Sequence, residues 1–335
     1  MWAFVVLTFT AMAWYKLTQP RILVLHSYAT DYSWTRDIDT GLKRVLDSKL
    51  GYKVQWHYMD TKNHPDRDSK RRAGTIARHA IEALKPRIII AIDDDAQAYA
   101  VREYAGSPDV TIIFAGVNGS VDAYGYNNAP NVTGIYEKKP LQSLRSALMA
   151  LTGPDGAPLG RRIMQIGDQS EPVKADVREV LALDWSPMKF VDSQLVATWE
   201  DWKNAVMSAK GRADMILISN YHNIYETADR KKLVGPEELL RWTYASSPVP
   251  VVGMGGFMVE EGGMFAVAAS GFEQGEIAAR LAVRVLDRGE AAGSIPHVMP
   301  RQFLVYMRRP LMEMHGISLP PLYESFARAS NNYYE

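Results

Sequence analysis

The chain has 335 residues, of which 47% are hydrophobic and 23% charged, and its 38 basic residues balance 38 acidic ones. This length accommodates two domains of ordinary size, each with its own core. The balanced charge argues against a nucleic-acid partner, which requires a concentrated basic face. The one dense basic run, Lys70-Arg71-Arg72, is interpreted as the solvated start of a helix. Because the chain has no cysteine, disulfides, thiolate metal sites, cysteine nucleophiles and lipid attachment to a cysteine are all excluded.

The N-terminal stretch predicts export. Residues 2–14 are apolar except for Thr8 and Thr10, and Ala11-Met12-Ala13 has the small-x-small form of a signal-peptidase site. The stretch is too short to span a bilayer as a helix. We therefore expect residues 1–19 to be a signal peptide or a signal anchor, with an ordinary buried segment as the alternative. The expected location is periplasmic or otherwise extracytoplasmic, with an N-terminal membrane anchor in the second case.

From residue 21 onward, short β-branched runs alternate with helical patterns, which is typical of βαβ units and parallel sheets. The expected strands and helices of the first set are strands at 22–25, 54–58, 88–92 and 111–114 and helices at 38–46 and 76–84. The pattern restarts after a stretch rich in glycine and asparagine at 116–130. Two successive sets of the same unit predict two similar α/β lobes.

The second set begins with a helix after Pro140. The other expected elements are strands at 162–166, 190–196, 215–219 and 249–254, a helix from Pro172, and a helix begun by a capping box of Thr198 and Asp201. A last helix through 277–285 lies between strands at 265–269 and 303–306, and these three elements complete existing sheets. The chain therefore crosses between the lobes more than once, which predicts a hinge of several segments.

These patterns predict an α/β fold of two Rossmann-like lobes with parallel sheets. Lobe I comprises 20–118 with 266–292, lobe II comprises 119–265 with 293–326, and 327–335 forms a C-terminal tail. In open α/β sheets, ligands bind beyond the carboxyl ends of the strands. The expected strand ends carry polar or glycine residues at 26–28, 93–95, 116–118, 168–170, 220–222 and 253–257.

Several of these residues have a structural alternative. One of Asp93, Asp94 and Asp95 could instead cap the helix that starts at residue 96. The glycines at 253, 255 and 256 lack the spacing of a phosphate-binding or dinucleotide-binding loop, and a tight turn explains them better. Asn131-Val132-Thr133 is formally a glycosylation sequon and is read as a turn and strand start. Tyr28, Tyr32 and Trp34 are equally compatible with a core and with a ligand wall.

Catalysis is not expected. His26, His222 and the aspartates at 93–95 are residue types that a metallohydrolase would use. No His-Glu-x-x-His, Gly-x-Ser-x-Gly or paired-histidine motif accompanies them. The sequence therefore predicts a protein that is not an enzyme and has no metal and no cofactor.

Seven segments in order carry a family resemblance: ILVLHSY at 22–28, YSWT at 32–35, YMDTK at 58–62, IAIDDDA at 90–96, IFAGVN at 113–118, NVTGI at 131–135 and HGISLP at 315–320. With these segments, residues 20–326 resemble the ABC-transporter substrate-binding family, which has the type I periplasmic-binding-protein fold. The resemblance is strongest to a sensor-type branch related to aromatic amino-acid binding proteins.

The resemblance implies a solute-binding protein that closes around a small polar ligand, such as an amino acid or another organic ion, and delivers it to the membrane permease of an ABC transporter. The alternative is a ligand-sensing module that signals to a separate membrane kinase or cyclase. The expected ligand contacts are Ser27, Tyr28, Trp34, Asp94, Asn118, Tyr136, Asp168, Asn220 and Gly255. No nucleic acid is expected among the partners.

Overall fold

The computed structural model describes residues 2, 7, 8, 10, 14, 19–49 and 51–335. The predicted signal peptide or anchor at 1–19 therefore lies largely outside the described residues. The chain divides into two compact units, Met1–Glu137 with Gly271–Met299 and Lys138–Ser270 with Pro300–Glu335. Among the described residues, no helix is long and apolar enough to cross a membrane.

The first unit is built on a five-stranded sheet of order β2-β1-β3-β4-β5, in which every pairing is parallel. Its strands are β1 (Arg21–His26), β2 (Lys53–Tyr58), β3 (Ile88–Ile92), β4 (Thr111–Val117) and β5 (Val132–Tyr136). All five residues of β3 are buried. A continuous apolar run of this kind is typical of a parallel strand covered on both faces.

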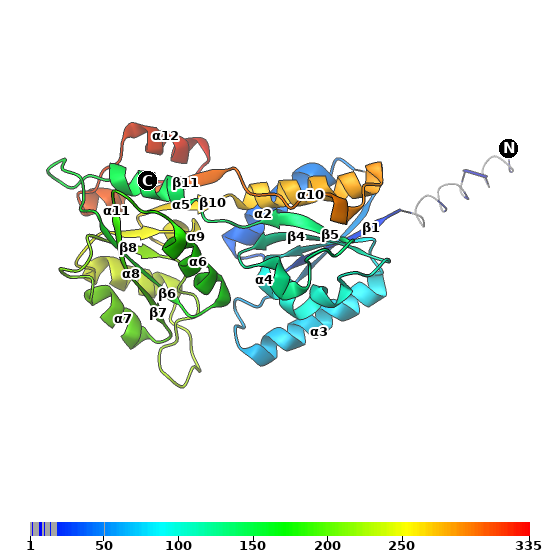
Figure 1. Cartoon of the computed structure of the whole chain (residues 1–335), viewed down its shortest axis with the longest axis horizontal. Helices are drawn as coiled ribbons and strands as arrows, with labels where there is room; N and C mark the ends of the chain where they lie inside the picture. The colour runs from blue at the N-terminus through cyan, green and yellow to red at the C-terminus, as the bar shows by residue number, and fades with distance from the viewer. Residues whose placement is uncertain (1, 3–6, 9, 11–13, 15–18, 50) are drawn as a thin grey trace. The chain divides into compact units, whose positions relative to one another are not determined.

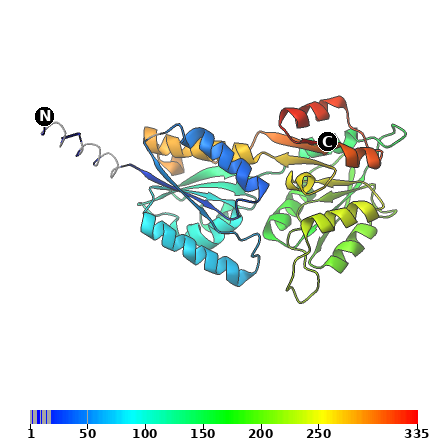
Figure 2. The same cartoon turned by 180° about the vertical axis from the view of Figure 1, so that it is seen from behind.

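Helices cover both faces of this sheet (Figures 1 and 2). On one face lie α2 (Ser33–Leu46) and α10 (Gly271–Arg288), and on the other lies α3 (Arg67–Leu84). The remaining helical segments of the unit are α4 (Asp93–Ala96), the π-helix η1 (Gln97–Val101), and the 3₁₀ turns η2 (Arg102–Tyr104), η3 (Val121–Tyr124) and η4 (Ala292–Ser294).

The second unit has a seven-stranded sheet of order β12-β11-β10-β9-β8-β6-β7. Its strands are β6 (Arg162–Asp168), β7 (Lys189–Val196), β8 (Met215–Ile218), β9 (Val251–Gly253), β10 (Phe265–Ala269), β11 (Phe303–Arg308) and β12 (Tyr333–Tyr334). Only the β10–β11 pairing is antiparallel.

The helices of the second unit are α5 (Leu141–Ala150), α6 (Glu171–Ala182), α7 (Trp199–Met207), α8 (Pro236–Ser246), α9 (Phe257–Glu260), α11 (Arg309–Met314) and α12 (Pro321–Ala329). Trp202 of α7 is fully buried, and its indole N–H donates to the hydroxyl of Thr243 on α8 at 2.9 Å. The predicted capping box at the start of α7 is confirmed, because the Asp201 backbone N–H donates to Thr198 Oγ1 at 3.3 Å.

The two α/β lobes are present, but the boundaries between them differ from the predicted ones. The first unit runs to Glu137 rather than to residue 118, because β5 pairs with β4. β10 belongs to the second unit rather than the first, because it pairs with β9 and β11. The return to the second unit comes after Met299 rather than at 293. The predicted tail at 327–335 is also folded, since it includes β12, which pairs with β11.

Candidate functional site

In each sheet, the strand order identifies the position at which a ligand is expected to bind. In the order β2-β1-β3-β4-β5, the direction of chain progression reverses between β1 and β3. In the second unit it reverses between β6 and β8. Ligands of open α/β sheets bind at such switch points, outside the carboxyl ends of the strands. Tyr28 follows β1, Asp93 and Asp94 follow β3, and Asn118 follows β4, so the first unit gathers these polar side chains at its switch point.

The backbone after β3 is unusual. Asp93 adopts a left-handed conformation with φ of 65°, which is uncommon outside glycine and more tolerated by aspartate than by most residues. Gly116 lies against it, since a Cβ at that position would stand 2.6 Å from Asp93 Oδ1. Helix α4 is not capped by any of the three aspartates, contrary to the predicted alternative. Instead the Ala96 N–H donates to Ser27 Oγ at 2.7 Å, which leaves the carboxylates free for other contacts.

Asp93 is a buried carboxylate with an unused oxygen. Only 2% of the residue is exposed, and its Oδ1 accepts a hydrogen bond from Trp34 Nε1 at 2.9 Å. No hydrogen bond from a described residue reaches its Oδ2. Burial and then the nearby charge of Glu137 raise the pKa of Asp93 well above its usual value, against the opposing effects of Trp34 and Lys62. A buried carboxylate oxygen without a partner is costly unless a ligand supplies a proton or a charge.

Asp94 belongs to a hydrogen-bonded group with three neighbours. Its Oδ1 accepts from the Tyr124 hydroxyl at 2.6 Å, and its Oδ2 accepts from the Asn118 backbone N–H at 3.3 Å. The Asn118 side-chain amide also donates to Glu137 Oε2 at 3.1 Å. Burial raises the pKa of Asp94, and the bonds from Tyr124 and Asn118 oppose that rise. Asn118 therefore bridges the carboxylate of Asp94, in α4, and that of Glu137, which follows β5.

Aromatic rings and one lysine complete this group. Tyr28 and Tyr32 meet edge to face with centroids 5.6 Å apart. The Lys62 ammonium lies 5.1 Å from the centroid of Tyr28 and 3.7 Å from that of Tyr32. Burial, followed by the charges of the three aspartates, raises the pKa of Tyr28 well above its usual value. These rings therefore share the electrostatic environment of Asp93.

We call Tyr28, Trp34, Lys62, Asp93, Asp94, Asn118, Tyr124 and Glu137 the acidic edge of the first unit. Its three carboxyl groups face one lysine. With the carboxyls ionised it has an excess of two negative charges, next to aromatic faces that attract cations. This combination suits a ligand with an ammonium or similar cationic group.

At the carboxyl ends of the strands in the second unit, the polar side chains have hydrogen-bond partners within the same edge. Asp168 is fully buried, and its Oδ1 accepts from the Ser170 N–H at 2.9 Å. Its Oδ2 accepts from the backbone and side-chain nitrogens of Asn223, at 3.1 and 3.2 Å. Asp168 therefore orders the loops that follow β6 and β8.

Asn220 orients a histidine on the same edge. Its Oδ1 accepts the backbone N–H groups of Tyr221 and His222, at 2.8 and 3.2 Å, and lies 2.6 Å from His222 Nδ1. His222 Nε2 lies 2.8 Å from Glu261 Oε1, and the Tyr221 hydroxyl donates to the other oxygen of Glu261. His222 stacks on Tyr221 with centroids 4.8 Å apart. The polar groups of this edge are thus hydrogen-bonded to one another.

Three of the predicted contact residues are held by contacts within their own unit. Ser27 is fully buried, and its hydroxyl joins the Ile92 carbonyl at 2.7 Å to the start of α4. Tyr136 packs on Phe114, and its hydroxyl lies 3.1 Å from His297 Nδ1. Gly255 is buried, and a Cβ there would stand 2.3 Å from the Phe257 ring.

The acidic edge also includes residues that the sequence did not single out as contacts. Tyr124 and Glu137 lie in segments predicted to belong to the second lobe, and Lys62 appeared only within the YMDTK segment. The proximity of Tyr124 and Glu137 to Asp94 depends on β5 joining the first sheet, whereas Lys62 follows β2. No group of three or more His, Cys, Asp or Glu side chains in the described part of the chain could hold a metal ion.

The model of the family described as ABC transporter substrate binding protein matches residues 32–320. The chain belongs to this family. No curated protein matches the sequence of this substrate-binding protein. A conserved domain protein from Vibrio cholerae matches its fold with a TM-score of 0.68 at 16% identity, covering 95% of this chain and 100% of that one.

Two further solved structures are similar to this substrate-binding protein. An ABC domain in complex with L-Trp from Streptococcus pneumonia has a TM-score of 0.67 at 18% identity, covering 92% of this chain and 98% of that one. A carbohydrate transporter solute-binding protein from Agrobacterium radiobacter, in complex with D-arabinose, has a TM-score of 0.54 at 14% identity. The match covers 92% of this chain and 99% of that one. The expected type I periplasmic-binding-protein fold is confirmed. The family is one of ABC transporter substrate-binding proteins, which are extracytoplasmic, and the Agrobacterium radiobacter structure is that of a solute-binding protein.

Proposed function

We propose that this substrate-binding protein binds a small organic ligand by a cationic nitrogen at the acidic edge and delivers it, outside the cytoplasm, to the permease of an ABC transporter. The observation that carries the proposal is the second carboxylate oxygen of Asp93, which is buried and has no hydrogen bond from a described residue. A ligand ammonium would supply that bond together with a compensating charge.

The neighbouring rings bear on the chemical character of the ligand. Tyr28 and Trp34 offer apolar surface beside Asp93, and the indole N–H of Trp34 fixes one oxygen of that carboxylate. A sugar could use the hydrogen bonds of such an edge but not its excess negative charge. Of the ligands named for the similar structures, L-Trp carries an ammonium group and D-arabinose does not. An amino acid or another organic amine is therefore the favoured class.

A thermal-shift screen tests this function. Amino acids, polyamines and quaternary amines are compared with uncharged analogues of the same shape and with sugars and carboxylates. We expect an amine to raise the melting temperature, because a ligand present at about 100 times its Kd adds about 2.7 kcal/mol to the folded state. Stabilisation by sugars or simple carboxylates, without any by amines, would contradict the proposal.

Binding of the amine identified in this screen should weaken as the pH is lowered. The pKa of Asp93 and that of Asp94 are raised in the free protein, so acidification protonates these carboxyls within a pH range where ordinary aspartates stay charged. A cationic ligand favours the ionised carboxylate, and it must therefore displace a proton at low pH. Calorimetry at about pH 8 and about pH 5 should show a larger Kd at the lower value. An affinity that rises on acidification would exclude carboxylate recognition.

A further inference from the structure

The basic run Lys70-Arg71-Arg72 lies near the start of α3, and Arg71 and Arg72 are exposed, as the sequence predicted. Lys70 Nζ pairs with Asp95 Oδ2 at 2.8 Å, and Arg72 donates to Ser69 Oγ at 2.7 Å. Arg71 has no side-chain hydrogen bond or ion pair with any described residue. It lines a hollow instead, together with residues that follow α4.

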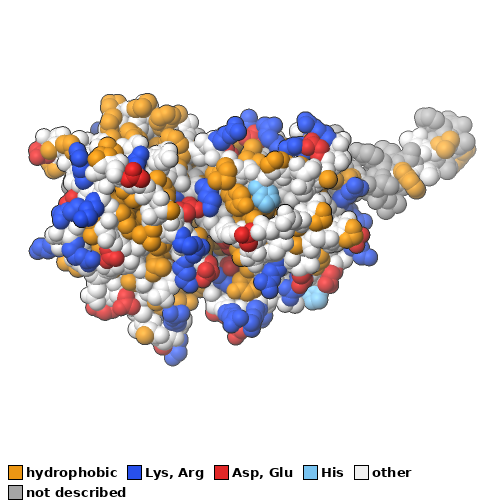
Figure 3. Space-filling model, viewed as in Figure 1, with side chains coloured by type: hydrophobic (Ala, Val, Ile, Leu, Met, Phe, Trp, Pro, Cys, Tyr) orange, Lys and Arg blue, Asp and Glu red, His pale blue; other side chains and the backbone are white. Residues whose placement is uncertain are grey.

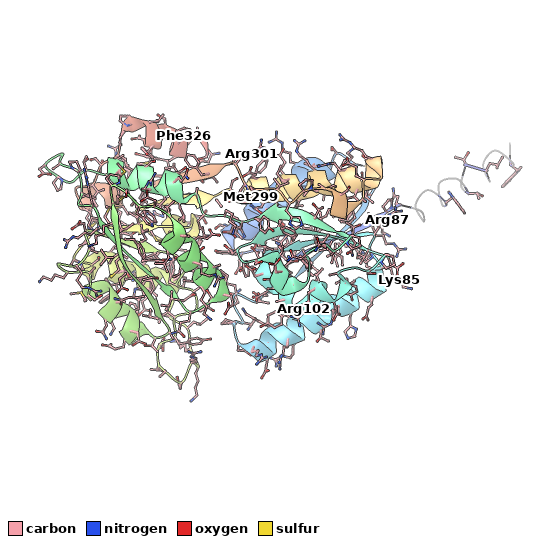
Figure 4. All side chains as sticks on the ribbon, in the orientation of Figure 1. Lys85, Arg87, Arg102, Met299, Arg301 and Phe326 are labelled. Atoms are coloured by element: carbon pink, nitrogen blue, oxygen red, sulfur yellow. The ribbon has the colours of Figure 1, made fainter. Side chains whose placement is uncertain are left out.

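This hollow lies between α3 and the helical segment that includes η1 and η2. It has a volume of about 360 Å³ and is lined by Arg71, Thr75, Arg78, Ala98, Tyr99, Ala100, Arg102 and Glu103. Arg71, Thr75 and Arg78 share one face of α3, since they are spaced by four and three residues. Figure 3 shows Lys and Arg side chains along α3, and Figure 4 marks Arg102 beside that helix. We call this feature the arginine hollow.

The walls of the arginine hollow are held in place. A Cβ at Gly74 would stand 2.4 Å from the Tyr99 carbonyl oxygen, so α3 and η1 are in close contact. Arg78 donates to that same carbonyl and to Thr75 Oγ1, and it pairs with Glu103 at 3.2 Å. The π-helix η1 is itself a rare element that often marks functional sites. Arg78 and Thr75 are therefore fixed, whereas Arg71 and Arg102, which also line the hollow, have no side-chain partners among the described residues.

The charges of the hollow favour an anionic group. Three guanidinium groups face one carboxylate, so 3 − 1 leaves an excess of two positive charges. Guanidinium groups bind phosphate oxygens through two parallel hydrogen bonds, and the Thr75 hydroxyl adds a further polar group. A volume of about 360 Å³ exceeds that of a phosphate ion alone and leaves room for an attached organic group.

We propose that the arginine hollow binds the phosphate group of an organic phosphate, at a site separate from the acidic edge. The phosphate could belong to a free phosphate ester or to the headgroup of an anionic phospholipid. The hollow is lined by residues of η1, which directly follows α4, and Asp93 and Asp94 of α4 belong to the acidic edge. The proposal holds whether or not the acidic edge binds an amine.

The test uses phosphorus NMR with glycerol 3-phosphate, and flotation with vesicles of phosphatidylglycerol or of phosphatidylcholine, all at one ionic strength. The variant Arg71→Gln with Arg102→Gln is compared with the control variant Arg67→Gln with Arg72→Gln, which removes the same charge from the same unit outside the hollow. All four side chains are exposed, and thermal melting confirms that each variant is folded.

We expect the wild-type protein to bind one of the two probes. The hollow variant should lose about tenfold in affinity, and the control should stay within about twofold. Binding of glycerol 3-phosphate identifies a free ester as the source, and binding to phosphatidylglycerol vesicles alone identifies a headgroup. Equal losses in both variants would mean unspecific attraction to a basic helix and would overturn the proposal. So would the absence of binding to either probe.

Discussion

Replacement of Asp93 by asparagine should weaken binding of the amine ligand by about 100-fold. The substitution keeps the oxygen that accepts from Trp34 Nε1 and replaces the oxygen that has no partner among the described residues. It removes the charge that would pair with the ligand in a buried setting, where an unpaired ammonium is costly. Isothermal calorimetry with the amine identified by thermal shift measures the change in Kd.

The same substitution should leave the free protein as stable as before or more stable. The pKa of Asp93 is raised in the folded state, so the folded protein binds more protons than the unfolded chain between the usual aspartate pKa and the raised one. Stability therefore falls as the pH rises through that window, and removal of the charge relieves this cost at neutral pH.

The matched control is Asp95→Asn, two residues further along the chain, whose carboxylate pairs with Lys70. We expect its Kd to stay within about threefold of the wild-type value, because a partly exposed ion pair contributes little. A ligand affinity unaffected by Asp93→Asn, or equally reduced by Asp95→Asn, would show that the ligand does not contact Asp93.

Replacement of Gly275 by alanine should destabilise the first unit by about 3 kcal/mol. Helices α2 and α10 approach so closely that a Cβ at Gly275 would stand 2.0 Å from the Ile38 carbonyl oxygen and 2.8 Å from the Leu42 nitrogen. Gly41 makes the reciprocal approach, at 2.1 Å from the Phe272 carbonyl oxygen. Both contacts are with backbone atoms, so a helix must move. The free-energy cost of that movement exceeds the gain of about 1 kcal/mol from the higher helix propensity of alanine.

Movement of α10 should also disturb the acidic edge. Gln274 accepts from the Gly116 N–H at 2.9 Å and donates to the Tyr136 carbonyl at 3.0 Å, and so joins the ends of β4 and β5. Differential scanning calorimetry should show a melting temperature lower by roughly 6–12 °C. Gly235→Ala is the control, because Gly235 is exposed and its nearest neighbour would lie 4.0 Å from the added Cβ. An equal effect at both glycines would contradict the close-packing explanation.

The order of elements could be read from the sequence because it is a local property. The isoleucine-rich run of β3 and the four-residue spacing of Ile38, Leu42 and Leu46 in α2 reflect burial on the faces of a sheet. The strand predicted at 265–269 matches β10 residue for residue. The placement of the candidate site after β1, β3 and β4 followed from the same pattern, since parallel strands carry their ligands at one edge. Asp94 and Asn118 follow β3 and β4 and are hydrogen-bonded to each other, and Trp34, a contact implied by the family resemblance, donates to the adjacent Asp93.

Local pattern could not show which neighbour a strand would join. β5 pairs with β4, and the prediction assigned it to the other lobe because a stretch rich in glycine and asparagine resembles a linker. That pairing brings Glu137 to Asn118 and Tyr124 to Asp94, so the error in the boundary hid two of the eight residues of the acidic edge. In the same way, polar residues at strand ends look alike in sequence whether they face a ligand, as proposed for Asp94, or hold loops together, as Asp168 does.

The sequence by itself determined the alternation of strands and helices, the two-lobed α/β class and the family resemblance, because periodicity and short motifs depend on neighbours along the chain. Only the tertiary structure decided which polar groups are satisfied. Ser27 and Asp93 follow adjacent strands, yet the hydroxyl of Ser27 is used within the fold whereas one oxygen of Asp93 has no partner among the described residues. The difference arises because hydrogen bonding and burial depend on residues far apart in the chain that the fold brings together.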